Sequence, residues 1–201
     1  MTRVQIVRDA FDSETEVAMF ADIENISKWY IGLNDVLDHE MDRDFLTDFM
    51  CSQNSFPVYL IVETFGDITK ELTALLEDQK LSYTFRQEGP TNKTFPVLKA
   101  VINDAHSFKL VIKETCWIAV ANNFFSLSFS DNCQYKTAMR KTIWGREKPY
   151  VHPFYCMKEP STVIHIWHDG DGFNLFSNEP RYKTFESLVQ HLPEGTSAVI
   201  E

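Results

Sequence analysis

Apolar and polar residues alternate along this chain in two different patterns, and the change between them falls near residue 57. From Asp12 to Met50, apolar residues recur every three or four positions, which predicts two helices, the second beginning near Asp35. The polar stretch Ser52–Pro57 then has the composition of a linker. Beyond it, short runs of β-branched and aromatic residues are separated by polar turns, which is typical of β-strands.

These later runs predict a mixed α+β unit. The expected strands lie at residues 58–62, 81–86, 95–102, 108–113, 124–129, 163–168 and 173–176. Asn103-Asp104 is the expected turn of a hairpin between the third and fourth of these strands. Helices are expected at residues 67–79 and 184–192, because the apolar residues in both follow the spacing of one buried helix face.

The chain is acidic, with 19 basic and 29 acidic residues and a formal net charge of −10. A field of this sign repels DNA, RNA and anionic membranes, so we expect neither nucleic-acid binding nor membrane insertion. The first nine residues lack the apolar core of a secretory signal peptide. The four cysteines are dispersed and form no C-x-x-C pair, so we expect a cytoplasmic protein with reduced thiols.

A search for catalytic and metal-binding patterns finds no P-loop, no G-x-S-x-G and no H-E-x-x-H. His165, His168, Asp169 and Asp171 form the best metal-like cluster. On a strand, however, His165 and His168 point to opposite faces, because they lie three residues apart. We therefore expect no enzymatic activity, no metal and no cofactor.

A polar turn after Arg86 is the clearest candidate for binding chemistry. Backbone N–H groups in the turn Glu88–Thr94 can surround an anion, and Thr91 and Thr94 add hydroxyl donors. An arginine at the end of the preceding strand can hold a phosphate through two parallel hydrogen bonds. Lys70, on the preceding helix, could close such a pocket from the side.

The order of these parts resembles a Src homology 2 domain. Phe65-Gly-Asp-Ile68, a helix and then Tyr83-Thr-Phe-Arg86-Gln-Glu88 resemble the family's opening W-[YF]-x-G-x-I-x-R, its first helix and its strand F-L-V-R-E-S. Ser107-Phe-Lys109 looks like the family's H-[YF]-K segment. Asp169-Gly-Asp-Gly-Phe173 and Phe185-Glu-Ser-Leu-Val-Gln-His-Leu192 resemble its closing glycine turn and its motif F-x-S-L-x-x-L-V-x-H-Y.

The resemblance implies an α+β fold in which a central antiparallel sheet is flanked by two helices. It places this domain at residues 56–195, with a large insertion at about 116–162. Residues 1–55 would precede it as an N-terminal helical segment, and residues 196–201 would follow as a tail.

The same resemblance implies a phosphotyrosine pocket with Arg86 at its centre. The residues carried over to it are Arg86, Lys70, Thr91, Asn92, Lys93, Thr94, Ser107 and Lys109. This chain departs from the family at Glu88, where the family usually has serine, and at Ser107, where it usually has histidine. A rival alignment matches Leu110–Thr115 to F-L-V-R-E-S and puts Lys113 in place of the arginine.

The function implied is recognition of tyrosine-phosphorylated peptides and proteins of a host cell by a monomer, with the insertion acting as a lid. The divergence from animal adaptors resembles the Src homology 2 domains of bacterial effectors of the Legionella type, which would place the protein in a host cytoplasm. The alternative is an acidic inhibitor or immunity-type interaction protein that binds no phosphotyrosine. Such a protein would use its negative charge on a cationic partner.

Overall fold

The computed structural model describes residues 2–11, 16–21, 23, 25–33, 39–87, 95–121, 123–141, 145–166 and 168–200. Its strands are β1 (Thr2–Arg8), β2 (Ser27–Leu33), β3 (Val58–Glu63), β4 (Ser82–Arg86), β5 (Val97–Ile102), β6 (Phe125–Ser128), β7 (Cys133–Lys141), β8 (Glu147–Tyr155), β9 (Thr162–Ile166), β10 (Phe173–Ser177) and β11 (Thr196–Ile200). Its α-helices are α1 (His39–Ser52), α2 (Gly66–Asp78), α3 (Ala105–Thr115), α4 (Trp117–Val120) and α5 (Phe185–Val189). Short 3₁₀ turns are η1 (Val17–Met19), η2 (His168–Gly170) and η3 (Pro180–Tyr182).

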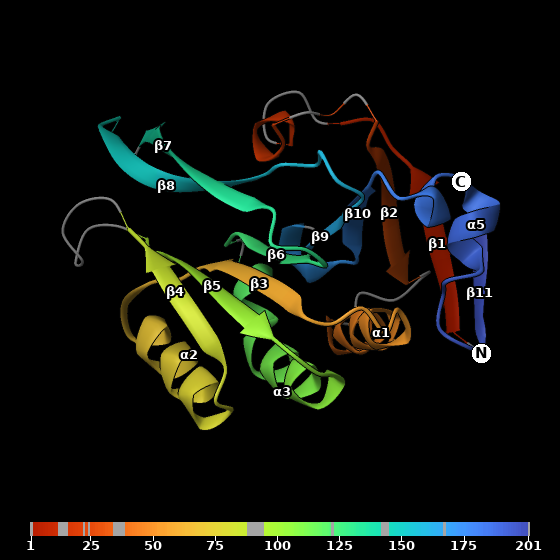
Figure 1. The fold of residues 1–201 in the computed structure, drawn as a ribbon, viewed down its shortest axis with the longest axis horizontal. Coiled ribbons are helices and arrows are strands. Elements are labelled where there is room, and N and C mark those ends of the chain that lie inside the picture. Colours follow the sequence, from red (N-terminus) through yellow and green to blue (C-terminus); the bar gives the residue numbers. More distant parts are fainter. Residues whose placement is uncertain are drawn as a thin grey trace.

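Nine of the strands form one mixed sheet with the order β11-β1-β2-β10-β9-β6-β3-β5-β4 (Figure 1). Neighbouring strands are antiparallel, except that β11 runs parallel to β1. The two remaining strands, β7 and β8, pair with each other as a separate hairpin. The prediction of an α+β protein is therefore confirmed, and the sheet is mostly antiparallel, as expected.

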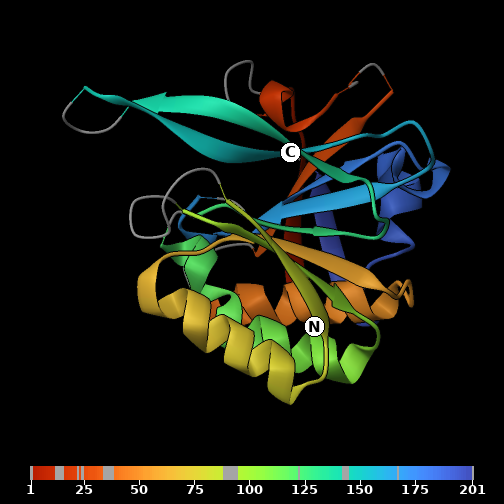
Figure 2. The ribbon, with the colours of Figure 1, turned by 60° about the vertical axis from the view of Figure 1, so that its left-hand side comes forward.

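One half of the sheet has a compact βαββαβ connectivity. The chain passes through β3, α2, β4, β5, α3 and β6, and these strands lie in the order β6-β3-β5-β4. This is the split arrangement of ferredoxin-like units, in which both crossover helices cover the same face of the sheet. Figure 2 shows α2 and α3 on that face together with α1, while the β7–β8 hairpin lies on the other side.

The sheet carries an apolar core on each face. Leu60 and Val62 of β3 pack toward the helices, whereas Ile61 between them packs toward the hairpin. The second core also contains Phe20, near η1, and Tyr155 of β8. Because β3 is buried on both faces, its sequence is a continuous apolar run instead of the alternation seen in half-exposed strands.

A row of polar side chains crosses the sheet on the hairpin face. The strand registers place Tyr30 beside Asn174, Asn174 beside His165, and His165 beside Ser126. Ser126 is hydrogen-bonded to the hydroxyl of the buried Tyr155. Burial lowers the pKa of His165 to about 4, so this imidazole is neutral at pH 7.

Near this row, the ammonium group of Lys28 is buried and lies 2.8 Å from carboxylate oxygens of both Asp9 and Glu16. The Asn174 amide donates to the second oxygen of Glu16 at 3.4 Å. Two carboxylates thus compensate one buried cation, which is the usual condition for keeping a lysine charged inside a protein.

The predicted strand at residues 108–113 is wrong, because this segment belongs to helix α3. Phe108, Val111, Ile112 and Thr115 are its buried positions, and their spacing is helical. Asp104, expected in a hairpin turn, instead caps the helix by accepting a hydrogen bond from the Ser107 N–H at 2.9 Å.

The N-terminal prediction is correct for one helix and wrong for the other. The second predicted helix is confirmed as α1, although its expected cap, Asp35, lies outside the described residues. The first is replaced by the single turn η1, and Ile26 leads into strand β2. Residues 196–200, which were expected to be part of a tail, form β11 and pair with β1. Neither strand was predicted from the sequence.

Candidate functional site

Arg86 is the last residue of β4, a strand at the edge of the sheet. The hydroxyl of Tyr83 donates a hydrogen bond to Glu77 of α2 at 2.6 Å, so Tyr83 points to the helical face. Side chains of a strand alternate between faces, so Arg86, three positions later, points to the hairpin face. Its cross-strand neighbour Val97 belongs to the core on that face, in agreement with this orientation.

A cavity of about 400 Å³ separates the end of β4 from the hairpin. It is lined by Arg86 and Gln87 from β4 and the residue after it, Tyr135, Lys136 and Thr137 from β7, and Val151 from β8. The guanidinium of Arg86 lies 5.8 Å from the centre of the Tyr135 ring. Among the residues that the structure describes, no carboxylate forms an ion pair with Arg86.

Tyr135 contributes a buried hydroxyl to this region. Burial and the neighbouring Cys133 thiol raise the pKa of Tyr135 well above its usual value, so the phenol is protonated at pH 7. Within the described part of the chain, its hydroxyl has no oxygen or nitrogen hydrogen-bond partner.

The hairpin that forms the second wall of the cavity is basic, although the chain as a whole is acidic. Residues 133–155 contain five Lys or Arg residues and one Glu. The ammonium of Lys136 donates to the carbonyl of Ala18 at 3.2 Å and lies over the Phe154 ring, so it anchors the hairpin to the N-terminal segment. The cavity therefore contains the guanidinium of Arg86 and is walled by a hairpin of net positive charge, a combination that favours an anion over a cation.

The remaining residues predicted for the phosphotyrosine site do not join Arg86. Thr91, Asn92, Lys93 and Thr94 lie outside the described residues. Lys70 is on α2, on the other face of the sheet, and its exposed ammonium lies 2.9 Å from Asp67.

Lys109 was expected on the strand at residues 108–113 and Ser107 directly before it, and the structure places both on α3. Ser107 is held in the first turn of that helix by the carboxylate of Asp104. Lys113 of the rival alignment is also on α3, in its last turn. The helical periodicity of this segment overrides its β-like composition, and it carries these residues to the face opposite Arg86.

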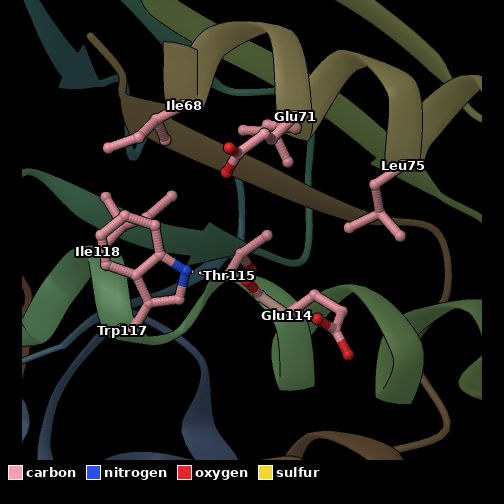
Figure 3. Close-up of a pocket in the computed structure, with 8 residues that line it drawn as sticks. Ile68, Glu71, Leu75, Glu114, Thr115, Trp117 and Ile118 are labelled. Atoms are coloured by element: carbon pink, nitrogen blue, oxygen red, sulfur yellow. Dashed lines mark hydrogen bonds between the residues drawn. The ribbon is translucent and has the colours of Figure 1, made fainter. Parts of the chain in front are cut away.

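A second hollow lies on the helical face, between α2 and the α3–α4 segment (Figure 3). Its volume is about 230 Å³. It is lined by Ile68, Glu71, Leu72 and Leu75 from α2 and by Glu114, Thr115, Trp117 and Ile118 from the facing segment. Ile68, Leu72 and Leu75 belong to the apolar face predicted for the helix at residues 67–79, whereas the position of Trp117 opposite them was not anticipated.

Thiol catalysis and metal binding were the other kinds of chemistry considered for the described residues. Burial raises the pKa of Cys116 to about 11 and that of Cys133 to about 12, so both thiols are protonated at pH 7. Over the same residues, no group of three or more His, Cys, Asp or Glu side chains is arranged to hold a metal ion. No helix in the described part of the chain is long and apolar enough to cross a membrane.

Tyr135 and Thr137 were not anticipated as site residues. Their alternate positions in the run from Cys133 to Lys141 place them on one face of β7, and only the packing of the hairpin shows that this face meets Arg86. Comparison of the chain with protein-family models, curated proteins and solved structures finds no match. Any assignment of function therefore depends on the chemistry of these two sites.

Proposed function

We propose that the protein binds a tyrosine-phosphorylated segment of a partner protein and that Arg86 holds the phosphate. The observation that carries the proposal is the environment of Arg86, which faces a cavity of about 400 Å³ against a basic hairpin and has no carboxylate partner in the described structure. A guanidinium and a phosphate form two parallel, charge-assisted hydrogen bonds. The ring of Tyr135 borders the same cavity beside the guanidinium.

A phosphotyrosine suits the walls of the cavity as well as its charge. The phosphate carries about −1.5 to −2 charges at pH 7, whereas the ring is flat and apolar. Val151 and the ring of Tyr135 offer an apolar surface beside Arg86. The ligand ring can pack there while its phosphate meets the guanidinium.

The position of β4 supports binding of a peptide in particular. β4 is the last strand of the sheet, and within the described residues no other strand pairs with its outer edge. An extended peptide can add to such an edge through backbone hydrogen bonds. The phosphotyrosine would then enter the cavity from a segment that lies along β4.

The proposal keeps Arg86 and the ligand that the resemblance to Src homology 2 domains implies. In this proposal the second wall of the binding site is the β7–β8 hairpin, and Lys70, Ser107 and Lys109 take no part in it. The hairpin belongs to the insertion at about 116–162, which the sequence analysis expected to act as a lid. In this proposal the partner is a host-cell protein and the site of action is the host cytoplasm, as for a translocated effector.

Fluorescence polarisation with a labelled phosphotyrosine peptide pool and its unphosphorylated twin tests the proposal. We expect binding only with phosphate present, and a loss of at least about tenfold in affinity in both Arg86→Ala and Arg86→Lys, because lysine cannot form the two-pronged contact. Phenyl phosphate should compete with the peptides.

Lys113→Ala is the matched control, since it removes one positive charge from the opposite face of the sheet. This variant should bind as the unaltered protein does. Equal binding of both peptide pools, or full affinity in Arg86→Ala, would show that the cavity does not recognise phosphotyrosine.

A further inference from the structure

The hollow between α2 and the α3–α4 segment has an apolar floor. Leu72 and Ile118 are almost fully buried, with 3% and 1% of their surface exposed, while Ile68 and Leu75 are partly exposed at its sides. Its volume of about 230 Å³ is below the ~300–1,000 Å³ of pockets that enclose a cofactor or a drug-sized ligand. The space is therefore suited to one or two side chains of a partner protein.

Trp117 forms one end of this hollow and is held in place there. Its indole N–H donates to the backbone carbonyl of Glu114 at 3.0 Å, as the dashed line in Figure 3 shows. Nevertheless, 44% of its surface remains exposed. A fixed and exposed tryptophan beside an apolar hollow has the properties of an anchor residue in protein interfaces.

Two carboxylates flank the apolar floor from opposite sides. Glu71 extends from α2 over the hollow, and Glu114 projects from α3 (Figure 3). Both are exposed, and neither forms an ion pair or a side-chain hydrogen bond in the described structure. Lys70, next to Glu71, is already paired with Asp67. The two carboxylates thus have no ion-pair partner in the described structure, although Lys113 lies next to Glu114 in the sequence.

We propose that the hollow and the eight residues that line it form a groove, and that this groove binds a basic amphipathic segment of a partner protein. A lysine or arginine side chain would lay its aliphatic stem over Leu72 and Ile118 and direct its charged end toward Glu71 and Glu114. Such side chains bury their stems on apolar surfaces while the charge stays in water. The indole face of Trp117 adds a cation–π contact.

The net charge of the chain supports this choice of partner. At −10, the protein attracts basic segments and accelerates their association. An acidic amphipathic segment would bury the same apolar area but would be repelled by Glu71 and Glu114. The groove lies on the opposite face of the sheet from Arg86, so this inference does not depend on the proposed phosphotyrosine site.

Fluorescence polarisation with three labelled peptides of about 14 residues tests the inference. One is an amphipathic Leu/Lys helix, the second is its scrambled sequence of equal composition, and the third replaces every Lys with Glu. We expect the first peptide to bind the full chain, the scrambled one to bind about tenfold more weakly, and the acidic one not to bind.

Charge-matched variants separate the groove from the general field of the protein. Glu71→Gln together with Glu114→Gln should weaken binding of the amphipathic peptide about tenfold, and Trp117→Ala should do so independently. Glu186→Gln together with Glu194→Gln removes two charges from exposed sites elsewhere and should change the affinity less than about twofold. Far-UV circular dichroism checks that every variant is folded.

Two results would overturn the inference. One is equal binding of the amphipathic and scrambled peptides, and the other is equal weakening by the two double variants. Either would mean that the peptide responds only to net charge. Arg86→Ala should leave binding of the basic peptide intact, so failure at one site is distinguishable from failure at the other.

Discussion

At the scale of single residues, the role of a side chain depends on the face to which its element directs it. Arg86 and Lys70 are both basic, and the sequence analysis placed both in one pocket. The structure directs Arg86 to the hairpin, whereas Lys70 projects into solvent from α2 beside Asp67. Sequence spacing alone could not separate them, because β4 and α2 are each placed by packing against the rest of the sheet.

His165 offers a prediction at this scale. Its pKa is about 4 in the folded protein because burial disfavours the charged imidazolium, and the ordinary value is 6.5. The unfolded chain therefore binds an extra proton as the pH falls from 6.5 toward 4. The free energy of unfolding should fall over this window, by on the order of 3 kcal/mol in total for this group.

Urea unfolding at pH 7 and pH 4.5 measures this effect. In His165→Gln, which cannot be protonated, the loss of stability between the two pH values should be smaller than in the unaltered protein. His106→Gln, which removes an exposed imidazole, is the comparison variant, and its acid response should stay closer to that of the unaltered protein than the response of His165→Gln does. An identical acid response in His165→Gln would mean that this histidine is not what makes the fold acid-sensitive.

At the scale of elements, α3 shows how a short apolar run can be consistent with two structures. Residues 108–113 are rich in β-branched and aromatic residues, and they follow an Asn-Asp pair typical of a turn. The same segment also fits a helix, with buried positions at 108, 111, 112 and 115. The surroundings of the segment favour the helix. Asp104 caps its first turn, and its apolar side packs against α1 and the sheet.

Replacing the cap tests this explanation. Asp104→Ala removes the acceptor of the Ser107 N–H and should lower the midpoint of thermal unfolding at pH 7. The hydrogen bonds from Ser107 also lower the pKa of Asp104. The stabilisation is therefore present above the ordinary pKa of 3.8 and is lost as the pH falls through the lower folded value.

Thermal unfolding of both proteins at pH 7 and pH 3 checks the prediction. The two melting curves should differ clearly at pH 7 and approach each other in acid. Asp104→Ser, which retains a capping oxygen, is the matched variant and should recover much of the difference. Equal midpoints for Asp104→Ala and the unaltered protein at pH 7 would show that packing alone holds α3.

At the scale of the whole molecule, the N-terminal strands β1 and β2 are joined to the rest of the sheet on both sides. β2 pairs with β10, and β1 lies between β2 and β11. Trp29 of β2 is 1% exposed, and its indole N–H donates to the Tyr182 carbonyl at 2.7 Å. α1 adds Phe49, whose ring contacts that of Phe173. Removal of β1, β2 and α1 would therefore expose the apolar side chains of β10 to solvent.

We therefore expect that a fragment spanning residues 56–195 will not fold stably by itself. It lacks β1, β2, α1 and β11, and thus the partners that bury Leu175 and Phe173. Near-UV circular dichroism and thermal unfolding should show neither fixed aromatic signals nor a cooperative transition, in contrast to the full chain. A cooperative transition in the fragment would show that residues 56–195 form an independent unit.

The sequence by itself determined the α+β class and most of the local elements. α1 and α2 could be predicted from their helical hydrophobic period, and β3 and β5 from short apolar runs between polar segments. β1 and β11 were not predicted, although Val4 and Ile6 of β1 alternate with polar residues; both strands are short, and they pair with each other from positions distant in sequence.

The candidate sites were decided by the tertiary structure. Arg86 could be identified from its place at the end of a predicted strand, but its neighbours Tyr135 and Val151 are brought to it by a hairpin about fifty residues later in the chain. Likewise, Trp117 meets Leu72 only because α2 and α3 cross to the same face. Periodicity fixes which face of an element is buried, whereas the packing of elements decides which faces meet.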